Sequence, residues 1–133
     1  MNLLSELFGE VISVYTREQA IDDGVLVDVS ETAREAGFKV PVAVTVELWS
    51  MITTIPKAYP GQDKKGRLWD VLYMAVLNAK RSSGSIINYK LTMHHEVENE
   101  KGKRILKNLE LKAVSGPGDK GEHVITIMLP YED

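Results

Sequence analysis

The hydrophobic period of the sequence changes once, near residue 82, and this change restricts the fold more than any other feature. Before it, residues 67–81 repeat apolar side chains at the 3.6-residue spacing of an α-helix. After it, residues 87–97 alternate apolar and polar side chains, as a half-buried β-strand does. Helices grouped before strands are typical of the α+β class, in which helices cover one face of a sheet.

Three strands are expected in the last third of the chain. The first, residues 87–97, is joined to a second at 105–113 by a polar turn centred on Gly102. A glycine-rich turn at 115–121 leads to the third, residues 123–129, which is almost wholly apolar and therefore suits a central position. We predict an antiparallel meander of three or more strands in the C-terminal half, packed against helices from the N-terminal two-thirds.

Two short helices are expected in the first third. Thr16 and Gln19 have the spacing of a capping box, and Gly24 suits the end of that helix. Ser30 is the expected cap of the second helix, which Gly37 ends.

Extended segments at 25–29 and 39–44 precede a third helix, which Thr45 caps and Pro56 ends. Residues 57–66 are rich in proline, glycine and charge, so we expect a polar loop there.

The helix at 67–81 is apolar on more than one face. Leu68 and Leu72 belong to its main stripe, and Trp69 and Tyr73 widen that stripe. Such a helix is either central in the domain or partly covered by a second subunit, so a homo-oligomer stays open.

The 133 residues fit a single domain, 1–133, and exclude several classes of site. There is no cysteine, which rules out disulfides, thiolate metal sites and cysteine nucleophiles. No stretch reaches the roughly 18 consecutive apolar residues of a membrane span. Residues 1–9 contain Glu6 and lack a basic start, so we expect no signal peptide and a cytoplasmic location.

The net charge of −3 is unevenly distributed along the chain. Residues 1–38 carry two basic and eight acidic side chains, whereas the remainder carries 14 basic and 11 acidic ones. Such an asymmetry can mark a surface for a protein or nucleic-acid partner, although a dedicated nucleic-acid surface normally shows a stronger basic cluster.

Four groups of segments carry a family resemblance. They are Tyr15–Arg17 with Gln19–Gly24 and Leu26–Val29; Ala33–Phe38 with Pro41–Ala43 and Thr45; Gly66–Asp70 with Leu72; and Leu111–Ala113 with Gly116–Asp119, Val124–Pro130 and Glu132–Asp133. In this order they resemble a family of small bacterial, plasmid and phage proteins known as a domain of unknown function. Residues 82–108 depart most from it. The resemblance implies a mobile-element context and implies no activity, ligand or catalytic residue.

Charged and phenolic side chains at 15–34 form the first candidate site. They are Tyr15, Arg17, Asp22, Asp23, Asp28 and Arg34. Carboxylates near arginines can support acid–base chemistry or bind a metal. The same residues can instead cap two short helices and pair with one another, and we favour this structural interpretation.

A second candidate is the aromatic and charged group around the loop at 57–66. Arg67, Trp69 and Asp70 follow this loop directly, and Trp49, Tyr59 and Tyr73 are the aromatics that would join Trp69 in a pocket or partner surface. The basic side chains beside them could attract an acidic partner or phosphates; they are Lys57, Lys64, Lys65 and Arg67. Core packing is the simpler expectation for the aromatics.

The remaining motifs indicate structure rather than chemistry. His95 and His123 are in phase with the apolar faces of their strands and would approach each other if the first and third strands were neighbours, but two histidines alone are a weak metal signal. The turn at 115–121 lacks phosphate-loop spacing and a following helix. We expect no cofactor and no metal.

These observations favour a non-enzymatic binding module, an accessory protein of a phage, plasmid or other mobile element that acts on a macromolecular partner. The candidate binding residues are Tyr15, Arg17, Asp23, Asp28, Arg34, Arg67, Trp69 and Asp70. The alternative is a small-ligand (nucleotide) binder or an enzyme that uses the acidic–arginine cluster at 15–34.

Overall fold

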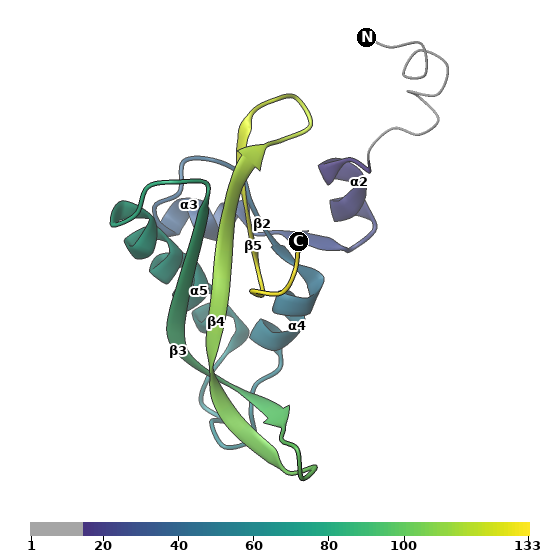
Figure 1. Cartoon of the computed structure of the whole chain (residues 1–133), viewed down its shortest axis with the longest axis vertical. Helices are drawn as coiled ribbons and strands as arrows, with labels where there is room; N and C mark the ends of the chain where they lie inside the picture. Colours follow the sequence, from purple (N-terminus) through teal and green to yellow (C-terminus); the bar gives the residue numbers. More distant parts are fainter. Residues whose placement is uncertain (1–14) are drawn as a thin grey trace.

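A five-stranded sheet runs through the part of the chain that the computed structural model describes, residues 15–133, in the order β1-β2-β5-β4-β3 (Figure 1). The expectation for residues 1–9 lies outside that part. The strands are β1 (Leu26–Asp28), β2 (Val42–Thr45), β3 (Ile86–Glu98), β4 (Arg104–Pro117) and β5 (His123–Met128). The predicted α+β class is confirmed.

The predicted meander accounts for only part of this sheet. β3, β4 and β5 pair antiparallel in succession, as expected. However, β2 pairs parallel with β5, and β1 pairs antiparallel with β2, so the sheet is larger and mixed. β5 therefore has a neighbour on both sides, which explains its nearly continuous apolar sequence.

Three helices, α3 (Ser30–Ala36), α4 (Val46–Thr53) and α5 (Lys64–Lys80), cover one face of the sheet (Figure 1). The short helix α2 (Arg17–Asp22) lies apart from them, next to β1 (Figure 1). No helix in residues 15–133 is both long and apolar enough to cross a membrane.

The hydrophobic core lies between the three helices and the sheet. Leu48 and Ile52 of α4 and Leu72 of α5 are fully buried there, together with Leu109 of β4 and Ile127 of β5. Burying each side chain of this size contributes about 1.5–3 kcal/mol relative to leaving it exposed. The apolar stripes predicted for α4 and α5 are therefore the faces that join the helix layer to the sheet.

Several predicted caps are confirmed. Thr16 and Gln19 form a complete capping box at α2, and Thr45 accepts a hydrogen bond from the amide of Leu48 at the start of α4. Gly37 follows α3 with φ at +123°, a conformation that residues with a Cβ rarely adopt.

Two predicted helix starts are wrong. Ser30 is the first residue of α3 rather than its cap, and its hydroxyl bonds to the main chain of Val42 instead. Helix α5 begins at Lys64 and not at Arg67, because the Asp63 carboxylate caps it by accepting from the amide of Gly66 at 2.6 Å. The polar loop predicted for residues 57–66 therefore ends at residue 63, because residues 64–66 belong to α5.

Candidate functional site

The acidic–arginine cluster at 15–34 does not converge on a single site. At one end, the Tyr15 hydroxyl donates to Asp23 Oδ2 at 2.5 Å on an exposed surface. This hydrogen bond is the main reason that the pKa of Tyr15 is raised. The hydrogen bond joins the residue before the N-cap of α2 to the residue that caps its C-terminal end.

Arg17 instead attaches α2 to the sheet. Its guanidinium donates to Thr126 Oγ1 at 2.6 Å and to the carbonyl oxygen of Ile125 at 2.8 Å. The Asp119 carboxylate accepts from the amides of Arg17 and Glu18 at 2.8 and 2.9 Å. Burial lowers the pKa of Arg17. Sequence reasoning missed the role of Asp119, which lies about a hundred residues away in the β4–β5 turn.

Asp28 and Arg34 are also separated. Asp28 Oδ1 accepts from the amide of Ser30 at 2.9 Å and from its hydroxyl at 2.6 Å, so it fixes the start of α3. Arg34 is exposed in the last turn of α3, where a cation interacts favourably with the helix dipole. The contacts of Asp28 and the position of Arg34 therefore favour a role in stabilising α3 over a role in a shared binding site.

Arg67 is the most buried charged side chain of the predicted set, with 3% of its surface exposed. Its guanidinium donates to the carbonyl oxygens of Met51 and Ile52 at 2.8 Å each, to Gln62 Oε1 at 2.7 Å and to the carbonyl oxygen of His94 at 3.2 Å. Desolvation by burial lowers its pKa, and nearby Asp70 opposes that effect. Arg67 thus connects the end of α4, the loop before α5 and the strand β3.

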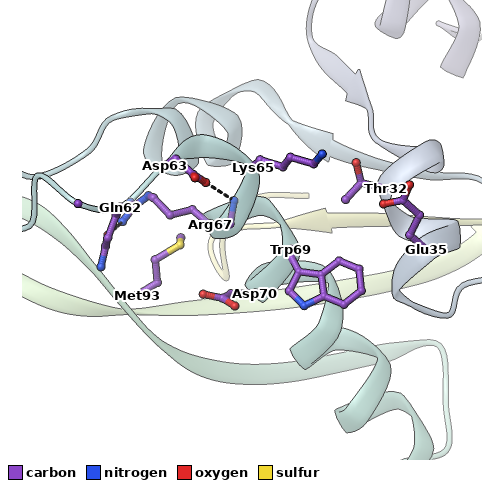
Figure 2. A pocket seen from close by; sticks show the side chains of 11 residues that line it. Thr32, Glu35, Gln62, Asp63, Lys65, Arg67, Trp69, Asp70 and Met93 are labelled. Carbon is purple, nitrogen blue, oxygen red and sulfur yellow. Dashed lines mark hydrogen bonds between the residues drawn. The ribbon is translucent and has the colours of Figure 1, made fainter.

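A groove of about 530 Å³ lies beside Arg67, between α3, the loop before α5 and the first turns of α5. In Figure 2 Lys65 and Trp69 extend from α5 toward Thr32 and Glu35, which project from α3. The lining residues are Thr32, Glu35, Gly61, Gln62, Asp63, Lys65, Gly66, Arg67, Trp69, Asp70 and Met93. The groove therefore brings together the second predicted group, Arg67 with Trp69 and Asp70, but none of the first.

One aromatic side chain, Trp69, lines this groove, and its neighbour Tyr73 lies one helical turn further along α5, outside the lining. Trp69 stacks on Tyr73 with ring centroids 5.9 Å apart and planes 11° apart. Their exposed fractions are 37% and 44%, although both are large apolar side chains. The core packing expected for the aromatics is therefore wrong for this pair: the spacing of four residues places both on the outer side of α5.

Thr32 and Glu35 are groove residues that sequence reasoning missed. Both belong to α3, whose buried residues are Ala33 and Ala36. The three-residue spacing of Thr32 and Glu35 indicates a shared helix face. The groove arises only because α3 packs on α5, and this contact is long-range.

A model of a family of unknown function (DUF6573) matches residues 1–133. The chain belongs to this family. The DUF6573 match covers every segment on which the resemblance was based, and the family description assigns no activity. Comparison with the curated proteins and with the solved structures gives no match.

The histidines of this DUF6573 chain do not form a pair. β4 lies between β3 and β5, so the strand arrangement that would have brought His95 and His123 together does not occur. His95 Nδ1 is buried without a hydrogen-bond partner, and burial lowers the pKa of its ring. His123 Nε2 lies 2.5 Å from Ser115 Oγ on an exposed surface outside the groove. No cluster of three or more metal-ligating side chains occurs within residues 15–133.

Proposed function

We propose that this chain is a non-enzymatic binding module that contacts a protein partner through the groove between α3 and α5. The mobile-element setting, an accessory protein of a phage or plasmid, is part of this proposal and rests on the sequence resemblance. The proposal needs no catalytic group, cofactor or metal.

The observation that carries the proposal is the exposed stacked pair of Trp69, which lines the groove, and Tyr73, which continues the aromatic surface along α5 beyond it. Aromatic side chains dominate binding hot spots, because they bury a large area with few rotatable bonds. Arg67 holds the underlying backbone in place through three hydrogen bonds to carbonyl oxygens, and a fourth joins it to the side chain of Gln62. Because the backbone beneath the aromatic side chains is already fixed, less conformational entropy is lost when a partner binds.

The alternative, a nucleotide binder or enzyme at 15–34, has weaker support. Arg17 and Asp28, its two central residues, are engaged in bonds that fix α2 and α3. The cavity beside Arg17 has a volume of about 210 Å³. Pockets for small molecules usually measure roughly 300–1,000 Å³, so this one is small for a nucleotide.

Site-specific photo-crosslinking tests the proposal. A photoreactive phenylalanine analogue replaces Tyr73 in one variant and Lys90 in the control, and both are irradiated in the host cell. Lys90 is exposed and lies between two residues of β3 that face the helices, so its side chain is on the opposite side of the sheet.

We expect a discrete protein adduct from position 73 and none from position 90. An adduct of twice 14.8 kDa would show that the partner is a second copy and would favour the homo-oligomer. Equal labelling at both positions, or no protein adduct at position 73, would contradict the proposal.

A further inference from the structure

A β-bulge divides the long hairpin of β3 and β4 into two parts. Residues 92–94 of β3 lie opposite a single residue of β4, Asn108. The part beyond the bulge, residues 95–107, forms an arm whose tip projects past the helices (Figure 1). Extra residues in one strand interrupt the ladder of hydrogen bonds and bend that strand, so the hairpin has a hinge at the base of the arm.

His95 is the first paired residue of the arm, directly beside this hinge. It lines a cavity of about 440 Å³ between the arm and the C-terminal end of α4, together with Met51 and Thr54. Its Nδ1 atom is buried and has no hydrogen-bond partner within residues 15–133. A neutral ring tolerates this position, because Nδ1 then carries only a lone pair while Nε2 carries the proton.

Protonation of His95 is unfavourable in this position. Both nitrogens of an imidazolium are donors, so Nδ1 would become a charged donor without an acceptor in a buried site. Desolvation by burial lowers the pKa of His95 most, and the cations Arg67 of α5 and Lys107 of β4 lower it further. The main-chain groups of Lys107 and Met93 raise the pKa, but neither forms a hydrogen bond with Nδ1.

The other charged side chains of the cavity belong to the arm and to the loop after α4. Lys57 of that loop adds a third cation, and α4 contributes only uncharged side chains to the lining. The carboxylates of the lining, Glu96 and Glu98, are both on the arm, and Arg104 of the arm pairs with Glu96. These carboxylates therefore stay near His95 if the arm moves, whereas Arg67 and Lys57 do not.

We propose that the arm is a pH-dependent element, which lies against the helices while His95 is neutral and turns away at the bulge when His95 is protonated. Because the folded pKa lies below 6.5, the closed arm binds fewer protons than the open arm. The closed arm is therefore most stable above a pH of 6.5 and loses stability as the pH falls toward the folded pKa. Within that window, each pH unit shifts the opening equilibrium by at most about tenfold.

Amide hydrogen exchange of the full chain at a pH of about 7.5 and of about 5.5, followed by NMR, tests this proposal. Protection factors are compared, because they remove the intrinsic pH dependence of exchange. An open arm should fray, since an isolated two-stranded hairpin is only marginally stable in water. We expect the amides of the paired residues Val97 and Ile105 to lose protection by at least about threefold at the lower pH, while those of α5 change less.

Two variants assign the effect to one histidine. His95→Leu removes the titrating group and keeps an apolar side chain, so its arm should stay protected at both pH values. His123→Leu is the matched control, because His123 is exposed and lies outside the lining of this cavity. It should keep the pH response of the parent. In the parent, the imidazole of His95 should titrate below 6.5 in an NMR titration.

Equal protection of the arm at both pH values, or a loss spread evenly over the arm and α5, would overturn the proposal. A parent-like pH response in His95→Leu, or an imidazole of His95 that titrates at 6.5 or above, would overturn it as well. If His95→Leu does not fold, the exchange and the titration of the parent decide. None of these outcomes depends on what binds the groove between α3 and α5.

Discussion

The Nε atom of Arg67 lies 2.8 Å from the carbonyl oxygen of Ile52, so a buried cation of α5 closes the C-terminal end of α4. The last carbonyls of a helix have no partner within the helix, and they carry the negative end of its dipole. Arg67 satisfies two of them, at Met51 and Ile52, and also fixes β3 through His94. The charge therefore holds three elements together at the floor of the groove.

Replacement of Arg67 should be costly. Arg67→Met keeps most of the volume but leaves the carbonyls of Met51, Ile52 and His94 without their donors. We expect the free energy of unfolding to fall by about 3 kcal/mol, measured by urea denaturation with tryptophan fluorescence.

The control is Arg104→Met. Arg104 pairs with Glu96 on the surface, with 79% of its side chain exposed, so its loss should cost less than about 1 kcal/mol. Equal costs for Arg67→Met and Arg104→Met would show that the buried network contributes no more than a surface pair.

Attachment of α2 should depend on pH through Asp119. Hydrogen bonds from the amides of Glu18 and Arg17 lower the pKa of Asp119 below its ordinary value of 3.8. Because the pKa of Asp119 is lower in the folded protein, its ionised carboxylate stabilises the attachment of α2 at a pH above 3.8. This stabilisation is lost as the pH falls through the pKa that Asp119 has in the folded protein. We expect the amides of Arg17 and Glu18 to lose protection only below a pH of about 3.8.

The variant Asp119→Asn separates this effect from general acid unfolding. It should increase the hydrogen-exchange rate of the Arg17 and Glu18 amides at neutral pH while the amides of α5 keep their rates. A uniform increase across the domain, or no increase at these two amides, would show that Asp119 does not hold α2.

The end of α3 should require glycine. Gly37 has φ at +123°, and an added Cβ would also contact Val76. Gly37→Ala should lower the free energy of unfolding by at least about 1 kcal/mol, measured by thermal or urea denaturation. Gly61→Ala is the matched control, since its φ is not positive and an added Cβ there has open space. A Gly37 variant as stable as the Gly61 variant would contradict this account.

Asp28 should act through stability rather than through binding. Asp28→Ala removes the acceptor for the amide and hydroxyl of Ser30, so the free energy of unfolding should fall by about 1 kcal/mol. Circular dichroism thermal melts measure this, with exposed Asp22→Ala as the control. Unchanged stability together with lost function would instead favour a ligand site at 15–34.

The sequence predicts the local elements better than their arrangement. Thr16 and Thr45 are read correctly as caps because capping depends on residues three positions apart. The parallel pairing of Val44 with Ile127 joins residues more than eighty positions apart, and β1 and β2 have only three and four residues. Strands this short carry too little periodicity to predict a pairing.

The candidate site is predicted only in part, because some of its residues are close in sequence and others meet only through long-range packing. Arg67, Trp69 and Asp70 are neighbours in sequence, so a single segment identifies them. Glu35 enters the groove only through the packing of α3 on α5, and Asp119 reaches α2 from the β4–β5 turn. No short-range pattern contains either contact.

The central claim is that a protein partner binds the groove between α3 and α5, and the variant Trp69→Ala tests it most directly. Two quantities are measured: the melting temperature, and the yield of protein adduct from the photoreactive residue at position 73. Trp69 is 37% exposed and stacks on Tyr73, so its truncation removes buried area and should lower the melting temperature, while capture by the variant that is still folded at the assay temperature falls at least about tenfold. Ile86→Ala is the control, because Ile86 is an exposed apolar residue outside the groove lining and its loss should leave capture unchanged. Full capture by a stable Trp69→Ala variant would show that the groove between α3 and α5 is not the binding surface.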